Sequence, residues 1–261
     1  MSEAPIPVPA ATILMLRDGP QAIEVFMVVR HHQIDFASGA LVFPGGKVDP
    51  GDNDVREYCD GSADVGDTEL SLMVGAIREA FEECGILLAR NKGESSLING
   101  EKLSTLDHYR DSLNKGELSI AQFLETENLV LACDRLHRFS HWITPDMMPK
   151  RFDTHFYLAE APDDHLAIHD GHESVDSIWI SPEDALAGAD NGKYTIIFPT
   201  RLNVEMLGES TSVDNAIEMA NKRKIIPVLP WTEKREDGVF LRIQPEAGYR
   251  ISEIKMEGNA P

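Results

Sequence analysis

The segment that ends at Cys84 restricts the fold of this chain more than any other. Its apolar side chains recur at spacings of three and four, the period of one face of an α-helix, and they are Leu70, Met73, Val74, Ile77, Phe81 and Cys84. Asp67 or Thr68 is placed to cap the start of this helix, and Gly85 is placed to cap its end. The sequence therefore predicts one long amphipathic helix that ends at Cys84.

The polar positions of the same helix carry Arg78, Glu79, Glu82 and Glu83. Residues three or four apart share a helix face, so Glu79 lies beside both other glutamates and Arg78 can reach Glu82. Like charges at this spacing destabilise a helix, which invites a compensating cation. An arbitrary cluster of this kind is usually a solvated surface, so the surrounding sequence has to decide between the two interpretations.

Short apolar runs predict strands elsewhere, at residues 11–16, 23–30, 40–43, 139–144, 153–159 and 174–180. Further helices are expected at residues 103–115, 120–127, 182–186, 200–207 and 213–221, and extended segments at 225–229 and 239–243. The acidic, turn-rich stretch 49–67 is expected to be a loop. Because strands and helices mix without regular alternation, the elements by themselves predict a mixed α and β domain.

The charge balance argues against one class of partner. The chain has 24 Lys+Arg against 44 Asp+Glu, a formal charge of −20, which is the reverse of a surface that binds a nucleic acid polymer. No apolar run approaches the ~20 residues of a transmembrane helix, so no membrane is expected as a partner. The acidic, proline-rich start lacks the features of a signal peptide. Three widely spaced cysteines are typical of reduced thiols, and together these features predict a cytoplasmic protein.

The residues around the glutamate cluster resemble a known motif. Pro44-Gly45-Gly46 stands before the helix, and the helix ends in Arg78-Glu-Ala-Phe-Glu-Glu-Cys-Gly-Ile86. Together they resemble the Nudix box, in which a glycine, five residues, a glutamate and seven residues lead to Arg-Glu-aliphatic-x-Glu-Glu-x-Gly-aliphatic. There are two departures. Asp52 replaces the first glutamate, and the 25 residues 53–77 separate Asp52 from Arg78 in place of seven, an insertion that a surface loop tolerates at little cost.

Residues outside the box resemble one branch of the Nudix hydrolases, which contains the mammalian peroxisomal coenzyme A diphosphatases and their bacterial relatives. The later segments that look like this branch are His141-Trp-Ile-Thr-Pro145 and Arg151-Phe-Asp-Thr154. Upstream of the box, the spacing of the coenzyme A pattern is kept by Arg30, Gly39 and Phe43-Pro-Gly-Gly46. Two positions depart from that pattern, because His31 replaces a small residue and Asp35 replaces an arginine, which reverses a charge.

The resemblance implies the Nudix fold, an α+β arrangement in which a mixed β-sheet is sandwiched between α-helices. The Nudix domain would span residues 8–190, with an insertion in the box at about 53–69 and a helical insertion at about 91–128. Residues 191–261 would form a C-terminal extension packed on the same domain. The resemblance also makes a homodimer a possible state, since dimers are common in this family.

The activity that the resemblance implies is hydrolysis of a phosphoanhydride bond with Mg²⁺ or Mn²⁺. Glu79, Glu82 and Glu83 would be the metal ligands, and Arg78 would orient a carboxylate. Glu173, just before the strand that contains Trp179, is a candidate general base or ligand, with an exposed loop acid as the alternative. The candidate contacts to the substrate are Arg30, Gly45, Gly46 and Arg151, although an ordinary surface position is the alternative for Arg151.

The box builds a diphosphate site and does not specify what flanks the diphosphate. A nucleoside diphosphate derivative is expected as the small-molecule partner, most simply coenzyme A or an acyl-coenzyme A, with ADP-ribose or a dinucleotide left open. A catalytically silent Nudix domain that senses a ligand is the alternative of a different class, and the three intact glutamates argue against it.

Two other groups of residues invite a functional interpretation. His165, His169 and His172 have a spacing that resembles a zinc site, but they lie in a polar loop without a fourth ligand, so surface histidines are expected. Trp142 and Trp179 lie in strand-like apolar runs, and we expect them in the core.

Overall fold

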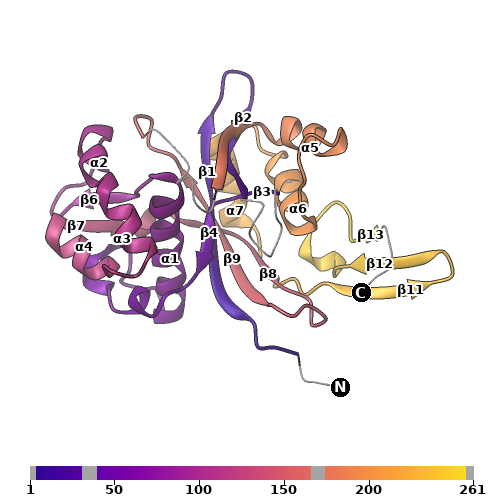
Figure 1. Ribbon diagram of the computed structural model, residues 1–261. Helices are drawn as coiled ribbons and strands as arrows, with labels where there is room; N and C mark the ends of the chain where they lie inside the picture. Colours follow the sequence, from indigo (N-terminus) through magenta and orange to yellow (C-terminus); the bar gives the residue numbers. More distant parts are fainter. Residues whose placement is uncertain (1–3, 31–39, 166–173, 257–261) are drawn as a thin grey trace.

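The computed structural model describes residues 4–30, 40–165 and 174–256. In these ranges the centre of the molecule is a seven-stranded sheet in the order β10-β2-β1-β9-β8, with β3 paired to β2 and β4 paired to β1 (Figure 1). Its strands are β1 (Val8–Asp18), β2 (Ile23–Arg30), β3 (Leu41–Val42), β4 (Gly45–Lys47), β8 (His137–Ile143), β9 (Phe152–Glu160) and β10 (Ser174–Ile180). The sheet is mixed, because β1 and β9 run parallel while the neighbouring pairs are antiparallel.

Helix α1 (Asp67–Cys84) covers one face of this sheet (Figure 1). Side chains alternate along a strand, so Ala11, Ile13 and Met15 of β1 project to the same side and join the apolar stripe of α1 in one buried cluster. The long amphipathic helix is therefore present as predicted, and its stripe is buried against the central sheet.

The two ends of α1 agree with the sequence prediction to different degrees. Gly85 ends the helix as predicted, with a φ of 68° that favours glycine and an N–H that donates to the carbonyls of Ala80 and Phe81. At the start, the N-cap position belongs to Gly66 and not to Asp67 or Thr68. The carboxylate of Asp67 pairs with Arg56 across the insertion, so it does not cap the helix.

Helices α5 (Pro182–Asp190), α6 (Phe198–Leu207) and α7 (Val213–Lys222) lie on the other side of the sheet (Figure 1). Leu14 and Leu16 of β1 alternate with the residues that face α1, and they share a second buried cluster with Leu202 and Leu207 of α6. Burying one such side chain contributes roughly 1.5–3 kcal/mol, so the segment after residue 190 supplies much of this core. A mixed sheet between helices confirms the predicted α+β fold class.

A smaller three-stranded sheet lies beyond α1, in the order β5-β7-β6. It consists of β5 (Cys59–Asp60), β6 (Ala89–Asn91) and β7 (Leu129–Ala132), with helices α2 (Gly100–Leu106), α3 (Arg110–Asn114) and α4 (Ile120–Glu127) beside it. Helix α4 has the predicted bounds. The single helix predicted at 103–115 is interrupted by a 3₁₀ turn at Asp107–Tyr109, and the predicted loop at 49–67 contains two 3₁₀ turns and β5.

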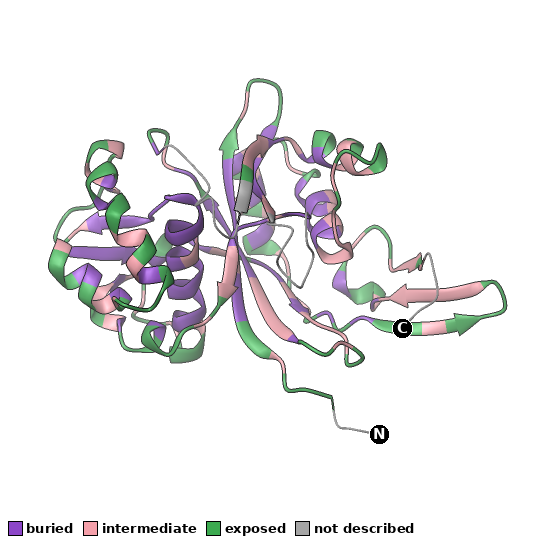
Figure 2. Ribbon diagram, in the orientation of Figure 1, coloured by how far each residue is buried: buried purple, intermediate pink, exposed green. Residues whose placement is uncertain are grey.

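The third sheet of the described chain consists of β11 (Trp231–Arg235), β12 (Gly238–Arg242) and β13 (Glu253–Lys255), and it projects from the body of the molecule (Figures 1 and 2). The extended segment predicted at 239–243 corresponds to β12. The one predicted at 225–229 is not a strand, and it contacts the sheet edge through a single bridge between Val228 and Trp142. Within the described ranges, no helix combines the length and the apolar character needed to cross a membrane.

Candidate active site

The strand β4 brings two glycines against the glutamates of α1. The N–H of Gly45 donates a hydrogen bond to Oε2 of Glu83 at 3.1 Å. A Cβ on Gly46 would lie 2.4 Å from Oε1 of Glu79, and a Cβ on Gly45 would lie 2.4 Å from the carbonyl oxygen of Ala11. A Cβ at position 45 would thus collide with the backbone of β1, and a Cβ at position 46 would displace the carboxylate of Glu79, so the two glycines let β4 pass close to both neighbours.

Arg78 connects the acidic residues of the box. Its guanidinium donates to both oxygens of Asp52 at 2.9 and 3.1 Å, to Glu79 at 3.1 Å, to Glu82 at 3.2 Å and to the carbonyl of Lys47 at 2.8 Å. Burial by itself would lower the pKa of Arg78, but the hydrogen bonds to Asp52 and the surrounding negative charges raise it above its usual range. The guanidinium group is permanently charged and carries five N–H donors in a fixed plane, which supports the predicted role of Arg78 in orienting carboxylates.

Asp52, which replaces the first glutamate of the box, faces Arg78. Only 1% of the residue is exposed, and its Oδ2 also accepts a hydrogen bond from the N–H of Asp49 at 2.8 Å. Both carboxylate oxygens are therefore occupied by protein donors. The shorter side chain serves as an anchor for the arginine, and the insertion between Asp52 and Arg78 does not prevent the two residues from meeting.

The carboxyl group of Glu82 is shifted toward its protonated form. Burial raises its pKa to about 7, against the lowering effect of Arg78. Only 4% of the residue is exposed, so an ionised Glu82 needs a cationic partner in addition to the arginine that it shares with Asp52 and Glu79.

A cavity of about 490 Å³ opens beside these groups. Its lining includes Gly45, Gly46, Arg78, Glu79 and Glu82, together with Phe43, Phe152, Phe156, Ile197 and Thr200. The lining thus combines the glycines and charged groups of the box with aromatic and aliphatic side chains. This combination suits a ligand with an anionic part and a larger, less polar part.

The carboxylates fit a hard divalent cation. Glu79 and Glu82 share Arg78, and Glu83 lies on the same helical turn. Together they offer more carboxylate oxygens than this arginine neutralises, and oxygen is the ligand type that Mg²⁺ and Mn²⁺ prefer. Among the residues that the structure describes, Glu79, Glu82 and Glu83 do not form a group in which one carboxylate oxygen from each lies within 4.8 Å of the other two. Mg²⁺ does not need such a closed cage, because it is usually bound by one or two carboxylates together with waters and substrate phosphates.

Several of the remaining predicted site residues lie partly or wholly outside what the structure describes. Arg30 is the last residue of β2, and its side chain lies outside what the structure describes. Glu173, Asp35 and His31 belong to ranges that the structure does not describe. The roles predicted for Arg30 and Glu173 therefore stay predictions.

The environment of Arg151 disfavours the predicted contact with substrate. Its guanidinium donates to the carbonyls of Thr144 and Pro5 at 3.0 and 2.7 Å and pairs with Asp146 at 2.6 Å. It is 8% exposed and does not line the cavity. These contacts tie the N-terminal segment to the loop between β8 and β9, which is a structural role that the sequence did not reveal.

Several cavity residues were not found by sequence reasoning. Phe152, Thr154 and Phe156 lie on β9, where alternation places them on one side of the strand. The segment Arg151–Thr154 was recognised as similar to the coenzyme A branch, so its residues could have been identified as cavity candidates. Ile197 and Thr200 at the start of α6 carried no such signal.

Of the three histidines with zinc-like spacing, the structure describes His165. His165 is 7% exposed, and its Nε2 donates to the carbonyl of Ile98 at 2.9 Å, so the expectation of a surface residue was wrong for this histidine. His169 and His172 lie outside the described residues. Trp142 is buried, and Trp179 is partly buried against Phe26, which agrees with the prediction that both pack in the core.

Comparison with solved structures assigns the fold. A crystal structure of a Nudix hydrolase from Alicyclobacillus acidocaldarius superposes with a TM-score of 0.66 at 27% sequence identity, over 82% of this chain and 96% of that chain. The central sheet, with a glycine strand facing a glutamate-bearing helix, is thus the Nudix fold.

Comparison of sequences then defines the family. The profile of the NUDT19 Nudix domain matches residues 56–205, which is more than half of the chain, and the chain belongs to that family. A Caenorhabditis elegans protein named nudix hydrolase 7 is 28% identical over 79% of this chain. The acyl-coenzyme A diphosphatase NUDT19 of Xenopus laevis is 25% identical over 66% of it. The matches span 62% and 56% of these two relatives, less than two thirds of their length.

Proposed function

We propose that this protein is a divalent-metal-dependent hydrolase of phosphoanhydride bonds whose substrate is coenzyme A or an acyl-coenzyme A. The observation that carries the proposal is that Arg78, Glu79 and Glu82 line a cavity together with Gly45 and Gly46, while Glu83 accepts a hydrogen bond from the N–H of Gly45. Membership of the NUDT19 Nudix domain family supports the same reaction class.

Each group of the site has a task in this reaction. Glu79, Glu82 and Glu83 would hold Mg²⁺ or Mn²⁺, which lowers the pKa of a bound water and neutralises charge on the phosphate oxygens. Arg78 fixes the carboxylates through its hydrogen bonds to Glu79 and Glu82. Water attacks one phosphorus atom, the bridging P–O bond breaks, and the water proton passes to a general base, for which Glu173 remains the candidate.

The shape of the cavity supports a substrate with a substantial less polar part. Phe43, Phe152, Phe156 and Ile197 are part of the cavity lining, and a nucleoside or pantetheine portion would bury apolar surface against them. The name of the Xenopus relative, an acyl-coenzyme A diphosphatase, favours this substrate over ADP-ribose or a dinucleotide. Asp35 in place of an arginine is the feature of the sequence that argues the other way.

The test is product release from coenzyme A, acetyl-coenzyme A, ADP-ribose, NADH and diadenosine polyphosphates in Mg²⁺ and in Mn²⁺. Glu83→Gln preserves the size of the side chain and removes its charge, and we expect turnover to fall by about 100-fold or more. Glu57→Gln, on an exposed glutamate of the insertion, is the matched control and should leave the rate unchanged.

Each outcome has a definite meaning. Turnover of coenzyme A compounds that is lost in Glu83→Gln supports the proposal. Turnover of only the other compounds would show that the protein is a hydrolase of phosphoanhydride bonds whose substrate is not a coenzyme A compound. Binding of a compound without turnover would overturn the hydrolase and favour the ligand sensor. Size-exclusion chromatography of the same preparation tests the predicted homodimer.

A further inference from the structure

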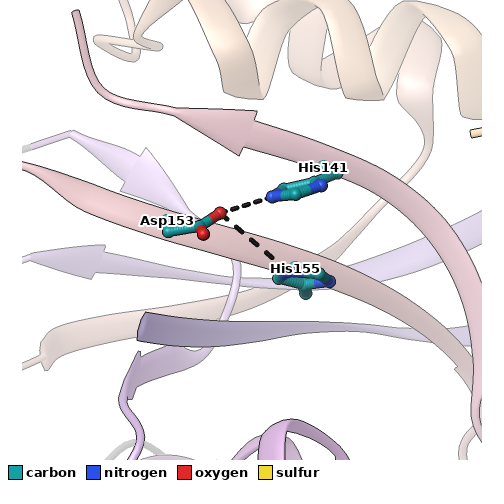
Figure 3. A group of neighbouring side chains, drawn as sticks. All are labelled: His141, Asp153 and His155. Carbon is teal, nitrogen blue, oxygen red and sulfur yellow. Dashed lines mark hydrogen bonds and ion pairs between the residues drawn. The ribbon is translucent and has the colours of Figure 1, made fainter. Parts of the chain in front are cut away.

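A second group of metal-ligand side chains lies on β8 and β9, away from the cavity. It consists of His141 of β8 with Asp153 and His155 of β9 (Figure 3). Side chains alternate along a strand. Thr154 and Phe156 line the cavity, so Asp153 and His155 project from the opposite face of β9.

The strand register brings the three residues together. His141 and His155 are direct partners in the antiparallel pair, and Asp153 is two residues before His155, so all three share one face. The two imidazole rings stack with centroids 3.9 Å apart and an angle of 29°. Because regular backbone pairing fixes these positions, the group is built into the sheet and does not depend on a loop.

One carboxylate oxygen faces both histidines. Oδ1 of Asp153 hydrogen-bonds to Nε2 of His141 and lies 3.9 Å from Nε2 of His155 (Figure 3). All three ligand atoms lie within 4.8 Å of one another. The ligand atoms of a tetrahedral zinc ion are roughly 3.3 Å apart, so a small side-chain rotation gives coordination distances.

The burial of the group suits a bound ion that keeps contact with water. The side chains of His141 and His155 are 12% and 16% exposed, and that of Asp153 is 38% exposed. The imidazoles are therefore held by packing, while the carboxylate side gives the ion a route in and leaves room for a water ligand.

We propose that His141, Asp153 and His155 bind one divalent transition-metal ion of the zinc class, separate from the cation at the helix glutamates. Two imidazole nitrogens and one carboxylate suit this class, whereas Mg²⁺ prefers oxygen ligands. The ion joins β8 to β9, and the other face of β9 forms part of the cavity. It therefore stabilises the strand pair beside the cavity, and its binding is independent of whether the protein is a hydrolase.

The experiment uses full-length protein that has been stripped with a chelator and titrated with Zn²⁺ against a chromophoric zinc indicator. All proteins carry Glu82→Gln and Glu83→Gln, so that zinc at the helix does not contribute. We expect one equivalent to bind, and we expect His155→Gln and His141→Gln each to weaken the affinity by at least about 100-fold, more than the loss of a group that only orients a ligand. His137→Gln, on the same strand but hydrogen-bonded to Asn221, is the matched control and should bind normally.

A second readout keeps the test valid if a histidine variant is unstable. In the protein that carries only Glu82→Gln and Glu83→Gln, called the parent here, zinc addition should shift the imidazole NMR resonances of two histidines. Those two histidines should be His141 and His155. Asp153→Asn is a further variant, and we expect it to weaken the affinity for zinc to the same extent. Absence of zinc binding in the parent, or undiminished binding in the folded His155→Gln variant, would overturn the proposal.

Discussion

The guanidinium of Arg78 makes two hydrogen bonds to the carboxylate of Asp52, at 2.9 and 3.1 Å, across a separation of 26 positions in the chain. The same guanidinium holds Glu79 and Glu82. The relationship means that Asp52 positions the proposed metal ligands through the arginine.

Replacing Asp52 by Asn should therefore destabilise the protein. The side-chain NH2 of asparagine cannot accept a hydrogen bond where a carboxylate oxygen now does, so a buried donor loses its acceptor. We expect a loss of about 2 kcal/mol in the free energy of unfolding. Urea denaturation measures it. Asp67→Asn, which affects an exposed pair with Arg56, is the control and should change the stability by less than about 1 kcal/mol. Equal losses in the two variants would contradict the anchoring role.

The close approach at Gly46 predicts a defect in activity. In Gly46→Ala the new methyl group would lie 2.4 Å from Glu79 Oε1, so the carboxylate has to move by about 1 Å, a displacement that can lower turnover by about 100-fold. Gly51→Ala is the control, because no atom lies within 4 Å of a Cβ at that position. Turnover of the best compound from the substrate panel is the measurement, and similar rates in the two variants would refute the prediction.

Phe152 allows a test of the apolar part of the cavity lining. Phe152→Ala would remove an apolar contact with the less polar part of the proposed substrate, and we expect KM to rise about 10-fold, with a smaller change in kcat. Phe240→Ala on β12, outside the cavity, should leave both constants unchanged. A fall in kcat at constant KM would show that Phe152 acts on the reacting groups instead.

Arg151 offers a test between substrate contact and structural support. Arg151→Met leaves the carbonyls of Thr144 and Pro5 without their donor, and we expect a loss of about 2 kcal/mol in stability with KM changed less than about 2-fold. Lys150→Met at the exposed neighbouring position is the control. A large rise in KM without a loss of stability would restore Arg151 as a substrate ligand.

The burial of His165 leads us to expect that the free energy of unfolding falls at acidic pH. Burial lowers the pKa of His165 below its ordinary value, so on acidification the unfolded chain takes up a proton at about pH 6.5 while the folded state resists it. The contribution of His165 to the free energy of unfolding is therefore fully present above that pH. It is lost as the pH falls, by up to about 1.4 kcal/mol per pH unit. Unfolding free energies between about pH 7.5 and about pH 5.5 should fall less in His165→Gln, whereas exposed His108→Gln should match the parent. Parallel pH profiles for His165→Gln and the parent would count against this assignment.

The sequence by itself determined the box helix, its cap at Gly85 and the acidic cluster, because helical periodicity and side-chain spacing are local properties. It also predicted the central-sheet strands β1, β2, β3, β8, β9 and β10, where short apolar runs stand between turn residues. It did not predict β4, because Gly45-Gly46-Lys47 has the composition of a turn. Four-residue β7 was not recognised, since a run this short carries no measurable period. The break of the helix predicted at 103–115 also depends on contacts distant in the chain.

Only the tertiary structure decided how these elements form a site. It brought Ile197 and Thr200 to the cavity that Gly46 also lines, turned Asp52 toward Arg78, and enclosed Arg151 between Pro5 and Asp146. It also paired His141 with His155, which the sequence placed fourteen positions apart without any motif. These relationships depend on strand register and packing between distant segments, which local sequence patterns do not encode.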